Sequence, residues 1–374
     1  MNLRSEFVMK ALGGANFRAL CREYGISAKT GYKWVDRFKQ DGLSGLSDAS
    51  RRPRGHARQL SEDMVCEIVR LKKLTPAWGP KKIRAIYARR HSQVPSESTF
   101  KRVLDKAGWV EHRRTRKREA AGRLYTQRRA EKPNDIWTVD FKGWWYSGEG
   151  SRCEPLTVRD EFSRYVLEVR AVPNARTETV RACFEKLFEQ HGLPGAIRSD
   201  NGAPFASRKA IFGLSRLSAW WLALGIDLER GRPGCPQDNG AHERLHADIA
   251  RELQGRPLPE RQAIFDTWRH EYNHERPHEA LGQRCPAEFF IPSERVYSGT
   301  PHDLDYGTML TRKVHVTGTI CWQRDHLKIS SALGGWSVGL EPTTSQHWNL
   351  WFGRLLLGSI DPTALTFIPL PLPS

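Results

Sequence analysis

The sequence predicts a multidomain protein with a helical N-terminal part, a central α/β domain and a C-terminal part built from short strands. Three observations support this division. Up to about residue 110, apolar residues recur every three or four positions, which is typical of amphipathic helices. From about residue 133, alternating strand patterns are separated by helical ones. After Phe290 only short strands follow, separated by Gly, Asp and Asn.

The chain is strongly basic. Its 59 Lys and Arg residues outnumber 42 Asp and Glu residues, which gives a formal net charge of +17 over 374 residues. A surplus of this size repels itself in the folded state and favours a polyanionic partner. No apolar run approaches the length of a membrane span, and the N-terminus lacks the core of a signal peptide. We therefore expect a nucleic-acid-binding protein of the cytoplasm, associated with the nucleoid and not with a membrane.

Residues 1–45 are expected to form a DNA-binding helix-turn-helix. Asn16 can cap a first helix, Gly25 permits the turn, and Ser27 can cap a second helix that runs to about Gln40. A basic stripe suited to a DNA major groove recurs at every fourth position of the second helix. It consists of Lys29, Lys33 and Arg37. An ordinary helical hairpin with solvated lysines is the simpler alternative.

Two basic linkers flank a second helical unit. The first linker, residues 46–60, lies mostly in a stretch rich in Gly, Ser and Arg (residues 42–58), and the second, residues 111–132, contains nine Lys and Arg against three Glu. Between them, residues 61–110 carry three amphipathic helical patterns, the first of which can be capped by Ser61. We interpret this unit as a second helix-turn-helix and the flanking segments as solvated linkers.

The central domain is expected over residues 133–295. The predicted strands are 136–143, 155–161, 164–172, 195–199 and 226–229, and the predicted helices are 176–190, 208–224 and 238–253. This order indicates an α/β domain on a mixed sheet. The short strands over residues 300–370 predict a small β-barrel.

Three acidic residues are distinguished by where they fall in this pattern. Asp140 lies in the first strand, Asp200 ends the fourth, and Glu243 lies in the first turns of a helix. Such carboxylates, brought together by the fold, could hold two Mg²⁺ ions for phosphoryl transfer on DNA. Taken singly, each acid has a simpler explanation as a strand-end, turn or solvated helical residue.

The surrounding motifs resemble those of integrase-core DDE transposases of bacterial insertion sequences, which are relatives of retroviral integrases. The matching stretches, in chain order, are Pro133-Asn134-Asp135, Trp137-Thr138, Asp140-Phe141-Lys142-Gly143, Asp160 with Ser163-Arg164, Ser199-Asp200-Asn201-Gly202, Gly225-Ile226, Arg232-Pro233-Gly234, Pro236-Gln237-Asp238-Asn239-Gly240 before Glu243, Tyr272-Asn273, Arg276-Pro277-His278 and Pro286-Ala287-Glu288. Ordered matches over about 150 residues are far more specific than a lone motif.

The resemblance implies a ribonuclease-H-like core with a mixed five-stranded sheet. It implies that Asp140, Asp200 and Glu243 are catalytic residues that ligate two Mg²⁺ or Mn²⁺ ions. It also implies double-stranded DNA as partner, both as element ends and as target, and a homo-oligomer assembled on that DNA. The expected activity is cleavage at the 3′ end of the element followed by strand transfer.

Weaker candidates lie near Glu243 and elsewhere. Arg244 and Arg251 could reach DNA phosphates from the catalytic helix, although most such residues are simply solvated. The tryptophan pairs Trp144-Trp145 and Trp220-Trp221 are expected to pack in the core or at an interface rather than to stack on bases.

Two alternative functions stay open. His242, Glu243 and His246 fit the H-E-x-x-H pattern of zinc peptidases, but no convincing third ligand follows and peptide cleavage leaves the net charge unexplained. A catalytically silent DNA-binding protein derived from a transposase is the second alternative. Intact acids at all three positions argue against it.

Overall fold

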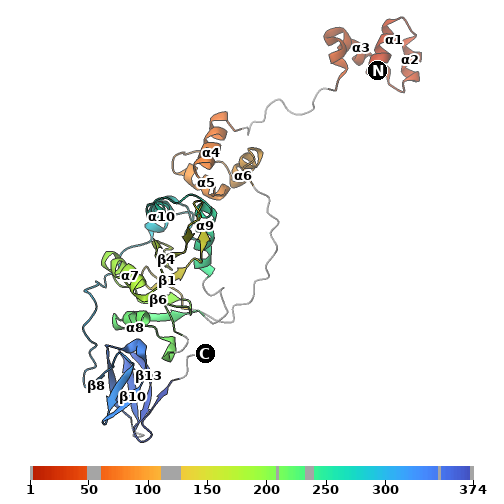
Figure 1. Cartoon of the computed structure of the whole chain (residues 1–374). Coiled ribbons are helices and arrows are strands. Elements are labelled where there is room, and N and C mark those ends of the chain that lie inside the picture. The colour runs from red at the N-terminus through yellow and green to blue at the C-terminus, as the bar shows by residue number, and fades with distance from the viewer. Residues whose placement is uncertain are drawn as a thin grey trace. The chain divides into compact units, whose positions relative to one another are not determined.

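The computed structural model describes residues 3–48, 60–110, 128–207, 210–231, 240–343 and 347–370. The chain divides into two units, Met1–Met64 and Val65–Ser374 (Figure 1). Most of the two predicted linkers, residues 49–59 and 111–127, and the motif residues 232–239 lie outside the described residues. Within the described ranges, no helix is both long enough and apolar enough to cross a membrane.

The first unit contains a three-helix bundle, α1 (Leu3–Leu12), α2 (Phe17–Glu23) and α3 (Ala28–Asp41), closed by the 3₁₀ turn Gly42–Leu46. The predicted caps are confirmed, because the side chains of Asn16 and Ser27 accept the backbone N–H groups of Ala19 and Thr30. The helix α1 was not predicted. Its Phe7 fills the centre of the bundle, where it contacts the rings of Phe17, Tyr24 and Trp34.

The second unit begins with three further helices, α4 (Glu62–Leu74), α5 (Pro80–Ala88) and α6 (Glu97–Lys106). Their buried apolar residues include Ile68, Ile83, Tyr87, Phe100 and Leu104. The ring of Tyr87 meets Phe100 edge to face at 5.4 Å between centroids. These contacts agree with the three amphipathic patterns in the sequence.

The central domain is built on a mixed five-stranded sheet in the order β5-β4-β1-β6-β7. The strands are β1 (Ile136–Phe141), β4 (Pro155–Asp160), β5 (Val166–Ala171), β6 (Ala196–Ser199) and β7 (Asp227–Arg230). Strands β5, β4 and β1 pair antiparallel, whereas β1, β6 and β7 pair parallel. The predicted mixed sheet is therefore confirmed, with strand ends that differ by one or two residues.

Helices cover both faces of this sheet (Figure 1). On one face, α7 (Thr177–His191) and α8 (Arg216–Ala223) pack against Trp137 and Val139 of β1. On the other face, α9 (Gly240–Leu253) and α10 (Arg261–His270) form a separate apolar cluster with β5. Because side chains alternate along a strand, Thr138 and Asp140 of β1 face the α9 side.

The predicted helix 208–224 is wrong in its first half. Residues 211–213 form a 3₁₀ turn, and α8 begins only at Arg216. Ser215 caps α8, since its hydroxyl accepts the N–H of Ser218 and its own N–H is bound by the Ser218 hydroxyl. Because Ser215 caps the start of α8, the helix cannot continue back through residues 208–214, even though their apolar spacing suggested it.

The predicted C-terminal barrel is not confirmed. Strands β8 (Leu310–Lys313), β11 (Ser337–Pro342), β12 (Trp348–Phe352), β13 (Leu355–Asp361) and β14 (Thr366–Pro369) form an antiparallel sheet in the order β14-β13-β12-β11-β8. Its edge strands β14 and β8 do not pair with each other within the described residues. Strands β9 (Thr319–Trp322) and β10 (Asp325–Lys328) instead form a separate hairpin, whose two-residue turn is Gln323-Arg324, both with positive φ.

Helix α8 is buried on two sides. Its Leu217, Trp220 and Trp221 belong to the apolar core of the central domain. Its Ala219 and Ala223 belong to a second core, which is otherwise formed mainly by the C-terminal strands. The central domain and the C-terminal sheet therefore share one helix.

Candidate active site

The pairing of β1 with β6 brings the first two predicted carboxylates together. The two strands run parallel, and Thr138 lies opposite Arg198. Two residues further along each strand are Asp140 and Asp200, at the carboxyl ends of neighbouring strands. Adjacent strands lie about 4.8 Å apart, so these two acids are neighbours at one edge of the sheet.

Helix α9 carries Glu243 in its first turn and is fastened to the sheet beside Asp140. The Thr157 hydroxyl donates to the carbonyl of Asp140 at 2.9 Å and also contacts Nε2 of His242 at 2.6 Å and Nε2 of His246 at 2.8 Å. The other ring nitrogen of His242, Nδ1, lies 2.9 Å from the Thr138 hydroxyl. Two threonines on adjacent strands thus hold the first turns of α9 against the sheet.

The charges of the other two acids act on Asp140. Burial, then the charge of Asp200, then that of Glu243 raise the pKa of Asp140 to about 7, against a backbone hydrogen bond from Phe141 that lowers it. Burial is the largest of these causes, and the contributions of Asp200 and Glu243 indicate that both charges lie near Asp140. Asp140 is half-buried, whereas Asp200 and Glu243 are exposed. The fold therefore gathers the three acids into one acidic site that is open to solvent.

The acids are neighbours without forming a closed ligand shell. Within the described residues, no three His, Cys, Asp or Glu side chains stand close enough together to hold a metal ion as they lie. The donor set nevertheless fits a hard divalent cation, since it offers only carboxylate oxygens and since burial, together with repulsion from Asp200 and Glu243, raises the pKa of Asp140. A bound cation would offset that repulsion.

A guanidinium lies beside the second acid. Burial lowers the pKa of Arg230, while the charge of Asp200 raises it. Arg230 donates to the carbonyl oxygens of Gly213 at 3.1 Å and Phe205 at 3.4 Å. It therefore ties the loop after Asp200 to the turn before α8 and leaves a positive charge near the acidic site.

The histidines of the H-E-x-x-H pattern are engaged with the sheet. The Thr157 hydroxyl has one proton, which it donates to the Asp140 carbonyl, so it accepts N–H groups from both histidines. Nε2 of His242 and of His246 is therefore protonated and cannot ligate a metal, and Nδ1 of His242 accepts from Thr138. This bonding argues against the zinc-peptidase alternative, because it engages the Nε2 atoms of both histidines.

The predicted DNA-contacting residues lie in different surroundings. A shallow groove along α3 is lined by Lys29, Lys33 and Arg37. The two lysines are exposed, and Arg37 is half-buried. On α9, Arg244 is exposed, whereas Arg251 pairs with Asp248 at 3.1 Å. None of these positions has a contact that identifies DNA, so their role stays a prediction.

Three of the four tryptophans in the predicted pairs lie in the core. Trp145, Trp220 and Trp221 are all buried, as expected for core residues. Trp144, in contrast, is 56% exposed. It precedes the short strand β2 (Trp145–Tyr146), in which residues alternate between solvent and core, and so points away from its buried neighbour.

Sequence reasoning did not anticipate the role of Thr138 and Thr157. Each is a buried polar residue with an apolar residue on either side of it in its strand, and each faces α9. The alternation of a hydroxyl with apolar neighbours was the available signal. Their histidine partners lie about 85 to 104 positions away in the chain, so the pairing could not be read from it.

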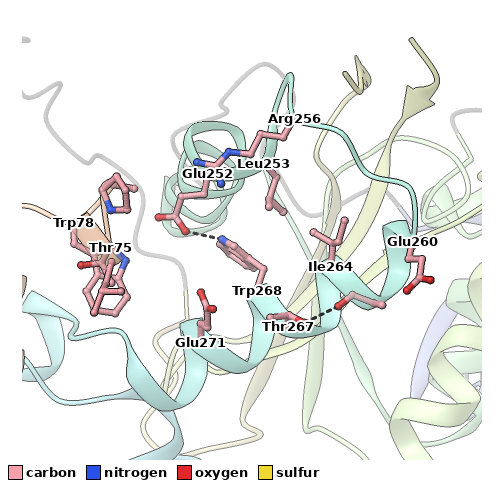
Figure 2. Close-up of a pocket in the computed structure, with 14 residues that line it drawn as sticks. Thr75, Trp78, Glu252, Leu253, Arg256, Glu260, Ile264, Thr267, Trp268 and Glu271 are labelled. Carbon is pink, nitrogen blue, oxygen red and sulfur yellow. Dashed lines mark hydrogen bonds between the residues drawn. The ribbon is translucent and has the colours of Figure 1, made fainter. Parts of the chain in front are cut away.

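A separate hollow of about 380 Å³ lies between the Leu74–Trp78 turn and helices α9 and α10 (Figure 2). At its floor, the Trp268 indole donates to the Glu252 carboxylate at 2.7 Å. None of the three predicted catalytic acids lines it. The hollow is therefore distinct from the acidic site.

Comparison with protein families assigns the domains. Residues 130–236 and residues 224–286 each match an integrase core domain. Residues 4–54 match a helix-turn-helix domain, and residues 30–104 match a homeodomain-like domain. The helical N-terminal part and the central sheet thus fall within domains of known type.

Similar proteins come from insertion elements. The uncharacterized 31.7 kDa protein of insertion element IS407 from Burkholderia multivorans is 25% identical over 61% of this chain and 81% of its own length. The uncharacterized 39.2 kDa protein of insertion element IS476 from Xanthomonas euvesicatoria is 24% identical over 66% of this chain and 70% of its own length. The chain therefore contains an integrase core and is similar to proteins of insertion elements.

Further matches to this integrase-core chain include a named transposase and two solved structures. The transposase for transposon Tn552 from Staphylococcus aureus is 25% identical over 64% of this chain and 52% of its own length. Among solved structures, the catalytic core domain of BIV integrase aligns with 42% of the chain and 93% of its own, at 21% identity and a TM-score of 0.31. The HTLV-2 integrase catalytic core domain in complex with magnesium aligns with 44% of this chain and 100% of its own, at 16% identity and a TM-score of 0.33.

Proposed function

We propose that this integrase-core protein is a DNA transposase, which binds the terminal repeats of its own element through the helical N-terminal units and cuts and joins DNA in the core. The observation that carries the proposal is the placement of Asp140 and Asp200 at the carboxyl ends of the paired strands β1 and β6, within an integrase core domain and with the charge of Glu243 acting on Asp140. The net charge of +17 supports a DNA substrate. The relative from Tn552 bears the name transposase.

Asp140, Asp200 and Glu243 would hold two Mg²⁺ or Mn²⁺ ions. When bound, such a pair stabilises the attacking and the leaving oxygen of a phosphoryl transfer. The protein's part is to keep the three acids in place. Strand pairing between β1 and β6 holds the first two, and the bonds from His242 and His246 to Thr157 hold the helix that carries the third.

The proposed reaction has two steps. Water attacks the phosphodiester at the element end and releases a 3′ hydroxyl. That hydroxyl then attacks a phosphodiester of the target DNA, so that one such bond forms while another breaks. The exchange needs no nucleoside triphosphate. Two element ends must meet at one target, so we propose that the chain acts as a homo-oligomer on DNA.

Glu243→Gln tests the catalytic part of this proposal. Purified protein is incubated with labelled DNA that carries the element's own ends, in Mg²⁺, Mn²⁺ or EDTA. We expect nicking and joining in either metal, none in EDTA, and a loss of at least about 100-fold in the variant, because a lost electrostatic contact to the transition state costs that much. Glu189→Gln, at an exposed position of α7, is the matched control.

The outcomes separate the proposed activity from its main alternative. Equal binding of the ends by wild type and variant, with cutting by wild type alone, supports the transposase. If both bind the ends and neither cuts in any metal, the catalytic proposal fails. A DNA-binding protein without catalysis is then the better description.

A further inference from the structure

Two exposed aromatic side chains lie on a hairpin that follows the strand of Asp140. The hairpin pairs β2 with β3 (Arg152–Cys153). Trp144 is 56% exposed and Tyr146 is 59% exposed, and their rings meet edge to face at 5.5 Å between centroids. Because they are two residues apart in an extended segment, they lie on the same face, opposite the buried Trp145.

Positive charge accompanies this aromatic pair. The Arg152 guanidinium lies 5.4 Å from the centre of the Trp144 ring, and the Lys142 ammonium lies 4.3 Å from the centre of the Trp145 ring. Arg152 also contacts Glu154, but its side chain stays 61% exposed. A polyanion that reached the Trp144 ring would therefore meet the Arg152 guanidinium on the same hairpin, whereas Lys142 lies with the buried Trp145 on the other face.

The hairpin is held rigidly against the segment between α9 and α10. The N–H of Gly148 donates to the Arg256 carbonyl at 2.8 Å, and the Glu149 carboxylate accepts the N–H of Leu258 at 2.6 Å. Arg261 donates to a backbone carbonyl and a serine hydroxyl of the hairpin. The two exposed rings thus stand on a fixed support, which lowers the entropy lost when a ligand binds them.

The position of the hairpin relates it to the acidic site. Trp144 follows Asp140 by four residues, so their Cα atoms are at most about 14 Å apart. A strand of duplex DNA advances about 3.4 Å per nucleotide, so this distance corresponds to about four nucleotides or fewer. A DNA strand with a phosphate at Asp140 therefore passes within reach of Trp144.

We propose that Trp144 and Tyr146 form a stacking platform for an unpaired base of the DNA end that enters the acidic site. Aromatic side chains bind unpaired bases of any sequence, because every base has a π-face. Large exposed aromatic rings on a rigid element of a basic protein are suited to such a ligand. The platform would hold the end open near the phosphate to be cut. This inference rests on the proposed transposase function.

Binding of two DNA ends tests the platform. The full-length protein is titrated, in EDTA, with a labelled duplex of the element end that is either fully paired or mismatched over its last few base pairs. We expect wild type to prefer the mismatched end. The double variant Trp144→Ala/Tyr146→Ala should lose about tenfold or more in affinity for that end and little for the paired duplex. Trp144→Phe/Tyr146→Phe should keep the preference, because a phenyl ring still stacks.

Two controls identify the cause of a loss. Phe162→Ala removes another exposed aromatic ring, in the turn between β4 and β5 at the opposite edge of the sheet, and should change neither affinity. Because Trp144 and Tyr146 are exposed, their replacement should leave the thermal unfolding midpoint unchanged. In addition, 5-iodouracil at the unpaired position should photocrosslink to residues 144–146 in the wild type.

The possible results decide between explanations. A double alanine variant that keeps the preference for the mismatched end, or a wild type without that preference, would overturn the platform and leave the transposase proposal intact. A wild type that binds neither duplex would overturn both. If the alanine variant instead changes the oligomeric state in sedimentation and keeps its preference, the aromatic pair is a protein interface and the platform is wrong.

Discussion

A single hydroxyl group connects the sheet to the helix of the third acid. Thr157 Oγ1 donates one hydrogen bond to the Asp140 carbonyl and accepts one each from His242 and His246, which uses its one proton and both lone pairs. The side chain is buried, so no water can replace a lost partner. Thr157 therefore sets the distance between the Asp140 strand and α9, which bears Glu243.

Thr157→Val tests whether this hydroxyl supports both the stability of the fold and the position of Glu243. Valine has nearly the same shape but leaves two imidazole N–H groups without an acceptor, so the free energy of unfolding should fall by about 1–3 kcal/mol. DNA cleavage should fall more than DNA binding, since Glu243 loses its support. Denaturant unfolding and the cleavage assay measure the two effects. Thr157→Ser keeps the hydroxyl and is the matched control, and a valine variant with full cleavage would contradict the argument.

Asp303 offers a pH-dependent test in the C-terminal part. Burial alone would raise the pKa of this carboxyl, but hydrogen bonds from Ser337, Lys313 and the N–H of Leu304 lower it to about 2. Because the folded pKa is below that of the unfolded chain, the stabilisation is complete above about pH 4 and is lost as the pH falls towards 2.

Asp303→Asn should remove this stabilisation. We expect the free energy of unfolding to fall by about 1–2 kcal/mol at pH 7, a range that allows for partial solvent screening. The difference between wild type and variant should shrink when urea unfolding is repeated near pH 3. A difference that stays constant between the two pH values would show that the charge of Asp303 is not its source.

At the scale of elements, α3 is positioned by close packing rather than by its basic residues. A Cβ atom at Gly31 would come within 2.8 Å of the Phe7 ring, so the helix lies directly against α1 at this position. The stripe of Lys29, Lys33 and Arg37 borders the groove on the outer side of α3. The packing therefore leaves the basic stripe free for a ligand.

Lys29→Ala and Lys33→Ala test whether this stripe contacts DNA phosphates. Each substitution should weaken binding to all DNA sequences alike and lower the slope of log affinity against log salt by about 1, since one counterion fewer is released. Lys39→Ala removes the same charge from another face of α3 and is the control. Fluorescence anisotropy over a salt series measures the slope, and equal slopes for all three variants would exclude α3 as the phosphate-contacting helix.

The elements differed in how far the sequence could predict them. Strands β1, β4 and β5 alternate or carry branched residues, so their periodicity was informative. Helix α1 was missed because its apolar residues do not form one clear stripe in the sequence. The barrel was predicted wrongly because strand spacing indicates how many strands there are, whereas pairing depends on contacts between distant residues.

The acidic site shows the same limit. Asp140, Asp200 and Glu243 could be selected from motifs around them, and their catalytic role stays a prediction. The hydrogen bonds from α9 to Thr138 and Thr157 could not be selected in this way, because they require the register of two strands against a helix. The exposure of Trp144 likewise depends on which face of a two-residue strand meets the core.

At the scale of the whole molecule, α8 joins the central domain to the C-terminal sheet. Removing the C-terminal strands would expose Ala219 and Ala223, which are 0% and 8% exposed. In addition, Arg295 and Arg354 both donate to the carbonyl of Gly225, directly after α8. We therefore expect the two parts to unfold together.

Leu350→Ala tests this coupling by a substitution in the C-terminal sheet, within the core that α8 shares. Leu350 is fully buried in β12, so the substitution should cost about 2–5 kcal/mol. If the two parts are coupled, hydrogen exchange should accelerate in α8 as well as in β11 and β13. Leu310→Ala, in the same sheet but 38% exposed, should have little effect. Faster exchange confined to the C-terminal strands would show that they fold independently.

During synthesis of the protein, the shared helix is made well before the core around it can be completed. Ala223 leaves the ribosome long before Ile360, which contributes to the same core. At about 5–20 residues per second, this interval lasts roughly 7–30 s. During that time the side of α8 that packs against the C-terminal strands lacks part of its core. All three acids have by then been translated, Glu243 soon after Ala223. A chain that stopped short would therefore be prone to aggregate, so that only completed copies should reach DNA in a folded form.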